Sequence, residues 1–160
     1  MCDASQKKRI LVVEDEVAIQ QVLSFFLKHH DFEVLAAFDG REAIRLIPLF
    51  KPDLIMLDLV MYPTSGWEVL RWLHTNHLTS LFPVLVMSSL VHLSDQMRAF
   101  EAGAIDYVTK PAQPSMIMER IHVLLALTSE QRVQLQHERI DEQRRTLARI
   151  SASQADEFVY

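Results

Sequence analysis

Cysteine is almost absent from this sequence, and so is any long apolar run. Cys2 is the only cysteine, so no disulfide can form within the chain, and the composition suits a reducing compartment. No stretch approaches the roughly 20 apolar residues that a membrane-spanning helix needs. The opening residues, MCDASQKKR, lack the apolar core of a secretory signal. We therefore expect a cytoplasmic protein with no membrane segment.

Positive charge is also scarce. The chain has 16 Lys and Arg against 21 Asp and Glu, and a net charge of -5 gives no electrostatic footprint for direct nucleic-acid binding. The seven histidines are scattered, without cysteine or acidic partners at ligand spacing, so no structural zinc site is predicted. At 160 residues and 49% hydrophobic content, the chain is long enough for one globular core and an extension.

Short apolar runs alternate with amphipathic stretches along most of the chain. Runs of four or five apolar residues are too short for helices and predict buried parallel strands. The predicted strands are 9–13, 33–37, 54–58, 84–88 and 106–109. Three predicted helices are 17–29, 67–74 and 93–102. Another opens at Asp39-Gly40 and is ended or kinked at Pro48. The last starts near Pro114, with no clear stop before Ser151.

Five strand-helix units in strict alternation indicate the α/β class. Right-handed crossovers then favour a doubly wound, five-stranded parallel sheet with helices on both faces. We expect the flavodoxin-like strand order 2-1-3-4-5, in which the first and third strands are neighbours at the point where the crossover direction reverses. Ligands of such sheets bind beyond the carboxyl ends of the strands at that point.

Charged residues stop three of the apolar runs. Glu14 and Asp15 follow the first strand, Asp58 ends the third, and Lys110 follows the fifth. Taken singly, each has an ordinary structural explanation. Glu14 and Asp15 could be acids placed before a helix, Asp58 a loop-capping residue, and Lys110 a solvated surface cation. Their joint position at strand ends instead predicts that they converge on one pocket.

Phosphoryl transfer to a carboxylate is the chemistry that fits this set. Asp58 would be the nucleophile, and Glu14 and Asp15 would hold Mg2+ directly or through water, because magnesium prefers octahedral oxygen ligands. A backbone carbonyl in the loop after Asp58, that of Val60, could add a metal ligand. The metal and Lys110 would neutralise the phosphoryl oxygens, and the hydroxyl of Ser88 could bond one of them.

These residues lie in motifs that resemble the receiver domain of two-component response regulators of the chemotaxis-regulator type. The resemblance covers roughly residues 8–127. It rests on ILVVEDE at 10–16, PDLIMLDLVM at 52–61, Gly66 eight residues after Asp58, PVLVMSS at 83–89 and AGAIDYVTKP at 102–111. Where the family usually has proline four residues after the acceptor aspartate, this chain has Tyr62 followed by Pro63.

The resemblance implies that Asp58 accepts phosphate from a histidine kinase or phosphotransfer protein. Lys110 would contact the phosphate ahead of a cis peptide at Pro111, Ser88 would be the switch hydroxyl, and Tyr107 the aromatic that moves inward. The surface of the fourth helix, fifth strand and fifth helix would then change for a homodimer or a downstream protein. The chain would be no enzyme, since it assists only its own phosphorylation and dephosphorylation.

Two alternatives to this switch remain open. One is a pseudo-receiver, an interaction module that keeps the fold without the phosphate chemistry; intact Asp15, Asp58 and Lys110 argue against it. The other is a fragment of a larger regulator whose output domain is missing. The residues after the receiver are too few for a DNA-binding or second-messenger domain.

The C-terminal part differs in composition from the rest. We divide the chain into a receiver domain at 1–128, a helical extension at 129–150 and a disordered tail at 151–160. Val133, Ile140 and Leu147 recur every seven residues, which indicates a thin coiled-coil seam. The extension is a solvated helix, a dimer contact or a docking element. One continuous last helix would extend about 50 Å at about 1.5 Å per residue.

Overall fold

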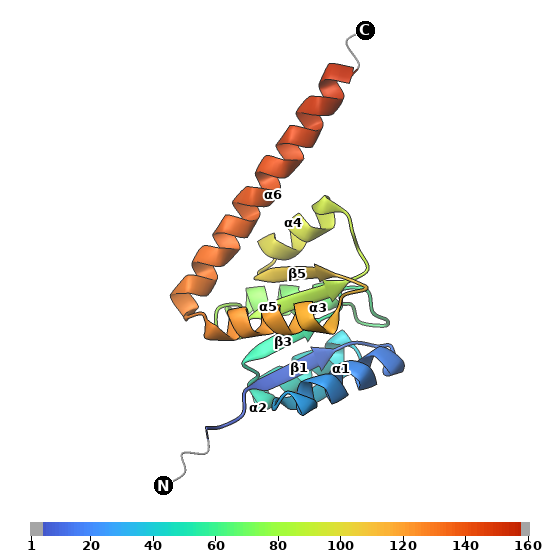
Figure 1. The fold of residues 1–160 in the computed structure, drawn as a ribbon, viewed down its shortest axis with the longest axis vertical. Helices are drawn as coiled ribbons and strands as arrows, with labels where there is room; N and C mark the ends of the chain where they lie inside the picture. Colours follow the sequence, from blue (N-terminus) through green and yellow to red (C-terminus); the bar gives the residue numbers. More distant parts are fainter. Residues whose placement is uncertain (1–4, 158–160) are drawn as a thin grey trace.

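One five-stranded parallel sheet forms the centre of the molecule. The computed structural model describes the backbone of residues 5–157 and the side chains as far as residue 155. The sheet order is β2-β1-β3-β4-β5, so the predicted fold class is confirmed (Figure 1). Its strands are β1 Arg9–Val13, β2 Glu33–Ala37, β3 Leu54–Leu57, β4 Val84–Ser88 and β5 Asp106–Thr109.

Helices cover both faces of the sheet because successive strand side chains point to opposite sides. Ile10 and Val12 pack with the helices α1 and α5, whereas Leu11 and Val13 pack with α2, α3 and α4. The helices are α1 Val17–His29, α2 Gly40–Phe50, α3 Gly66–Thr75, α4 Leu93–Glu101, α5 Pro114–Ala126 and α6 Ser129–Glu157. Within residues 5–157, no helix is both long enough and apolar enough to cross a membrane.

The register of the sheet aligns the ends of the strands that carry the charged residues. Val13 at the end of β1 pairs with Leu57 at the end of β3, so Glu14 and Asp58 follow at the same level. The amide of Lys110 donates to the Ser88 carbonyl at 2.9 Å, which fixes the end of β5 beside that of β4. The sheet thereby presents all these positions at one edge.

The last helix predicted from Pro114 is two helices, so that prediction is wrong. α5 ends at Ala126, Leu127 adopts an extended conformation, and α6 begins at Ser129. A capping box starts α6: the Gln131 amide donates to the Thr128 hydroxyl at 3.2 Å, and the Thr128 amide donates to the Gln131 side chain at 2.8 Å. The chain turns at this point, and α6 runs past α4 instead of prolonging α5 (Figure 1).

The predicted disordered tail is also wrong over most of its length. α6 has 29 residues and continues through residues 151–157, so the helix spans about 44 Å at about 1.5 Å per residue. The hydroxyl of Ser151 donates to the Leu147 carbonyl at 3.0 Å, within the helix. Residues 158–160, the last three of the predicted tail, lie outside the described part of the chain.

Candidate functional site

Three acids and a lysine meet where β1, β3 and β5 end. Glu14 and Asp58 are buried, with 2% and 7% of their surfaces exposed, and Asp15 beside them is exposed. The side chain of Lys110 reaches across from the end of β5 with 17% of its surface exposed. The structure thus brings together the four residues that the strand-end pattern selects.

Lys110 is the cationic centre of this group. Its Nζ donates a hydrogen bond to Asp58 Oδ2 at 3.0 Å and a second, short one to Glu14 Oε2. Both carboxylates are nearly removed from water, where an unpaired charge costs several kcal/mol. One ammonium therefore compensates two buried acids.

The three acids also form a candidate metal site. Glu14, Asp15 and Asp58 can each turn one carboxylate oxygen so that the three oxygens lie within 4.8 Å of one another. Three carboxylate oxygens suit a hard divalent cation such as Mg2+, which keeps several waters and uses few protein ligands. The donor set therefore fits the magnesium that the sequence predicts.

The protonation equilibria of the pocket reflect its burial and its charges. Burial raises the pKa of Glu14 above its ordinary value, the Lys110 hydrogen bond lowers it, and the charge of Asp58 raises it. Burial by itself would lower the pKa of Lys110, but the hydrogen bond to Glu14 and the charge of Asp58 raise it on balance. Lys110 accordingly stays protonated at neutral pH and available to an anionic group.

The loop after β3 positions Asp58 through its backbone. The Val60 amide donates to Asp58 Oδ1 at 3.1 Å, and the Gly66 amide donates to the Leu59 carbonyl at 3.1 Å. A Cβ on Gly66 would lie 2.1 Å from the Asp58 carbonyl oxygen, closer than atoms can approach. Glycine is required here because the start of α3 packs directly on the backbone of Asp58. The Tyr62-Pro63 and Lys110-Pro111 peptide bonds are both cis, the second as the resemblance implies.

Ser88 and Tyr107 lie beside the acids and are linked through Leu90. The Leu90 amide donates to the buried Ser88 hydroxyl at 3.3 Å, and the Tyr107 hydroxyl donates to the Leu90 carbonyl at 2.7 Å. Burial raises the pKa of Tyr107, so its hydroxyl remains a donor. Tyr107 is 9% exposed and therefore already lies inward, where the sequence analysis expects it only after Ser88 turns toward a phosphate.

Sequence reasoning missed a positioning residue behind the acids. The side chain of Gln20 on α1 is buried, and its amide nitrogen donates to the Val12 carbonyl at 2.8 Å and the Ala37 carbonyl at 3.2 Å. These bonds tie α1 to the ends of β1 and β2, directly before Glu14. The available signal was one polar residue among the inward-facing positions of an otherwise apolar helix face.

An apolar groove adjoins the site between α1 and the loop that follows β5. It encloses about 650 Å³, and Lys110 and Ser89 form its end beside the acids. Its walls are apolar and come from both sides, including Ile19, Val22, Phe26, Pro111, Ala112 and Ile117. Val22 of α1 is 67% exposed and faces this groove rather than the core.

Comparison with known proteins identifies the family of the chain. Residues 10–122 match the family model of the response regulator receiver domain. The chain belongs to this family. The receiver domain carries all four charged residues of the pocket, with Asp58 at the end of β3, and the predicted resemblance is confirmed.

Relatives and solved structures agree with this assignment. The chain is 37% identical over 117 residues to the cell cycle response regulator CtrA of Brucella ovis, covering 73% of this chain and 50% of that protein. It therefore spans about half the length of the curated relatives that it matches. The BeF3-activated N-terminal receiver domain of Klebsiella pneumoniae RstA superposes with a TM-score of 0.69 at 27% identity, over 75% of this chain and all of that one.

One solved structure includes more of the C-terminal region. The CheY-like receiver domain protein of Methanospirillum hungatei superposes with a TM-score of 0.68 over 88% of this chain and 99% of that one. At 24% identity this likeness bears on the fold alone.

Proposed function

We propose that this receiver domain is a phosphorylation switch whose acceptor is Asp58. A histidine kinase or a phosphotransfer protein would be the donor. The observation that carries the proposal is the paired contact of Lys110 with Asp58 and Glu14, inside an acidic group that can hold a cation. This arrangement provides a nucleophile, a counter-charge and a metal site within one pocket.

The reaction is the transfer of a phosphoryl group between two side chains. An oxygen of the Asp58 carboxylate attacks the phosphorus of a phosphohistidine, a P–O bond forms, and the P–N bond of the donor breaks. The donor imidazole leaves with the electron pair of that bond and takes up a proton. Lys110 moves its hydrogen bond from the carboxylate to a phosphoryl oxygen and stabilises the charge that develops there.

Mg2+ bound to Glu14, Asp15, Asp58 and the Val60 carbonyl would neutralise the remaining phosphoryl charge. Asp15 is exposed and can reach the cation through water. We infer that the switch assists only its own phosphorylation and dephosphorylation.

The apolar groove supports a protein as the donor. One end of the groove is at Lys110, and one wall is α1, where the lining residue Val22 is 67% exposed. Phe25, on the same helix, is 74% exposed. An apolar surface next to a charged pocket suits a helical partner that delivers its phosphohistidine over the acids. A cytoplasmic location remains a prediction from the cysteine content.

The switch would act through Leu90. If the Ser88 hydroxyl turns to bond a phosphoryl oxygen, its bond with the Leu90 amide at 3.3 Å is lost. The same residue holds the Tyr107 hydroxyl, so the loop between β4 and α4 responds as a unit. The phosphoryl group thereby shifts the equilibrium between two conformations that differ in the position of α4.

Replacing Asp58 with asparagine tests the acceptor. We expect the wild-type chain to be labelled by a small phosphodonor such as acetyl phosphate in the presence of Mg2+, and Asp58→Asn or addition of a chelator to abolish labelling. Asp31→Asn is the matched control, because Asp31 is exposed and asparagine tolerates its φ of 70°. Unlabelled wild type under these conditions would instead support a pseudo-receiver.

The phosphoryl group should be long-lived. Val60 and Leu90, two residues beyond Asp58 and Ser88, are apolar and cannot orient an attacking water by hydrogen bonding. Since Val60 is 52% exposed, Val60→Gln adds an amide at the entrance of the pocket and should accelerate loss of phosphate at least about tenfold. Val91→Gln, at the similarly exposed Val91 in the neighbouring loop, should leave the rate unchanged. Decay of the labelled protein measures this, and a wild-type half-life of seconds would refute it.

A further inference from the structure

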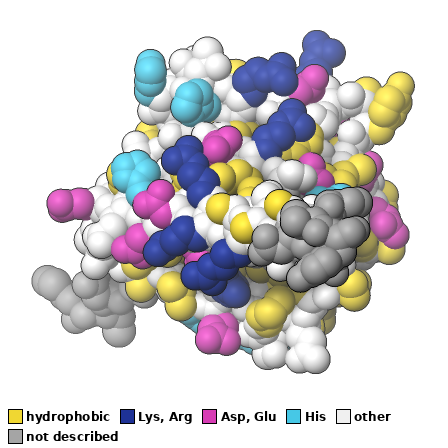
Figure 2. Space-filling model, turned by 90° about the horizontal axis from the view of Figure 1, so that it is seen from above, with side chains coloured by type: hydrophobic (Ala, Val, Ile, Leu, Met, Phe, Trp, Pro, Cys, Tyr) yellow, Lys and Arg dark blue, Asp and Glu magenta, His cyan; other side chains and the backbone are white. Residues whose placement is uncertain are grey.

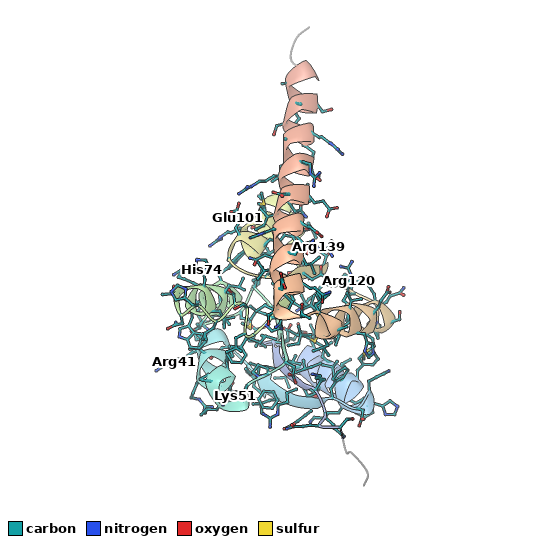
Figure 3. All side chains as sticks on the ribbon, turned by 90° about the vertical axis from the view of Figure 1, so that its left-hand side faces the viewer. Arg41, Lys51, His74, Glu101, Arg120 and Arg139 are labelled. Atoms are coloured by element: carbon teal, nitrogen blue, oxygen red, sulfur yellow. The ribbon has the colours of Figure 1, made fainter. Side chains whose placement is uncertain are left out.

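The helix α6 lies against the body of the domain along α4. Gln143 donates to the Gln96 side chain at 3.1 Å, Gln136 donates to the Phe100 carbonyl at 2.8 Å, and Arg144 pairs with Glu101 at 3.6 Å. Figure 3 shows α6 crossing α4, with Glu101 labelled on α4 and Arg139 labelled on α6. α6 therefore covers part of the face formed by α4, β5 and α5.

Asp106, the first residue of β5, anchors α6 to the sheet. Its side chain is 5% exposed and receives two hydrogen bonds from Arg120 of α5, at 2.8 and 3.0 Å. Arg139 of α6 reaches the same carboxylate at 3.5 Å. Because Arg120 alone satisfies Asp106, the Arg139 contact can open without leaving a buried charge unpaired.

The docked side of α6 is largely polar. Gln136, Arg139 and Gln143 lie at helical spacings of three and four residues. Two apolar residues of α6, Leu135 and Ile140, pack against the core. Hydrogen bonds and partly exposed ion pairs of this kind exchange with water at small net cost. The docking of α6 on the domain accordingly has a defined geometry but contributes little free energy.

α6 also bridges two elements that respond differently to the phosphorylation site. α4 follows directly after the loop in which Leu90 holds Ser88 and Tyr107, whereas Asp106 is fixed in the sheet by its pairing with Leu85. A displacement of α4 would separate Gln96 and Glu101 from their partners on α6 while Asp106 stays in place. One rigid helix cannot keep both sets of contacts.

We propose that α6 is a built-in cover of the α4-β5-α5 face, and that it undocks when Asp58 is phosphorylated. The inference rests on the proposed function. While it is docked, α6 occupies part of the face on which the sequence analysis expects a homodimer or a downstream partner to bind. Undocking exposes that face. Because the two equilibria are linked, weaker docking of α6 should lower the free energy needed to reach the phosphorylated conformation.

Hydrogen exchange of the full chain tests the docking directly. Beryllofluoride with Mg2+ serves as the phosphoryl mimic, and 19F NMR reports whether it is bound. At saturation, we expect the amides of residues 132–146 to lose protection about tenfold or more, because an isolated polar helix is only marginally stable. Amides of β1 and β3 should keep their protection.

Two arginine variants test the coupling. Arg139→Gln removes the contact with Asp106, and we expect it to bind beryllofluoride about fivefold more tightly than wild type. Arg145→Gln is the matched control on the same helix, because Arg145 is exposed and donates to the Asp141 carbonyl of α6 itself. It should bind as wild type does.

The outcomes separate the two proposals. Bound beryllofluoride with unchanged exchange in α6, or equal affinities of wild type and Arg139→Gln, would overturn the cover and leave the phosphorylation switch standing. Failure of wild type to bind beryllofluoride would overturn the switch and the cover with it.

Discussion

Gly66→Ala is expected to lower the free energy of unfolding by about 3 kcal/mol or more. The new Cβ would lie 2.1 Å from the Asp58 carbonyl oxygen and 2.8 Å from the Leu59 Cα, and neither backbone atom can rotate away as a side chain would. The start of α3 must then move away from the backbone of Asp58 and Leu59. Total stabilities are only roughly 5–15 kcal/mol, so this loss should appear as a large drop in the urea midpoint.

Ser65→Ala is the control for this substitution. Ser65 directly precedes α3, and its side chain makes no capping hydrogen bond there, so its removal should change the stability by less than about 0.5 kcal/mol. Equal urea midpoints for Gly66→Ala and wild type would show that the close approach of α3 to Asp58 is not as described.

Lys110→Gln is expected to slow phosphorylation of Asp58 about a hundredfold or more. The substitution removes the ammonium that contacts both carboxylates and that would bond the transferring phosphoryl group. It also leaves Glu14 and Asp58 facing each other in a buried pocket, which raises the pKa of Glu14 further. Lys28→Gln, at an exposed lysine on α1, is the charge-matched control and should be labelled at the wild-type rate.

Initial rates of labelling by acetyl phosphate at fixed Mg2+ measure this effect. A Lys110→Gln rate within about twofold of wild type would show that the lysine only compensates the charges of Glu14 and Asp58 in the unphosphorylated protein. The effect of Lys110 on the reaction would then lie far below the range seen for groups that stabilise a developing charge.

Most of the sheet and its pocket could be predicted from sequence because both depend on local patterns. A buried strand between two helix layers needs an unbroken apolar run, and all five strands of the structure begin where such runs predict them. The charged residues that stop three of these runs then converge through topology alone. The end of α2 was less well placed: the helix continues past Pro48 to Phe50 because proline near the last turn removes only one hydrogen bond.

The C-terminal region was predicted poorly for two physical reasons. The break after Ala126 has a sequence signal in Thr128 and Gln131, but a capping box is easily overlooked inside a long run of helix-forming residues. The contact of α6 with α4 and β5 is made largely by amides and guanidinium groups, and a search for apolar periodicity cannot detect a polar docking face.

Figure 2 views the molecule from above, and on this face basic side chains are interspersed with acidic and apolar ones. This face therefore lacks the single-sign field that nucleic acids select, and the net charge of the chain is -5. The charged residues with the clearest structural roles are those of the acidic pocket and those that join α6 to the domain.

Locating the phosphoryl group in the wild-type chain tests the central claim most directly. After incubation with acetyl phosphate and Mg2+, the protein would be digested and its acyl phosphate located by mass spectrometry, with Asp58→Asn treated in parallel. We predict modification at Asp58 and an unmodified corresponding peptide in the variant. Modification at Asp15 or Glu14, or none in the wild-type chain, would contradict the assignment of Asp58 as the acceptor.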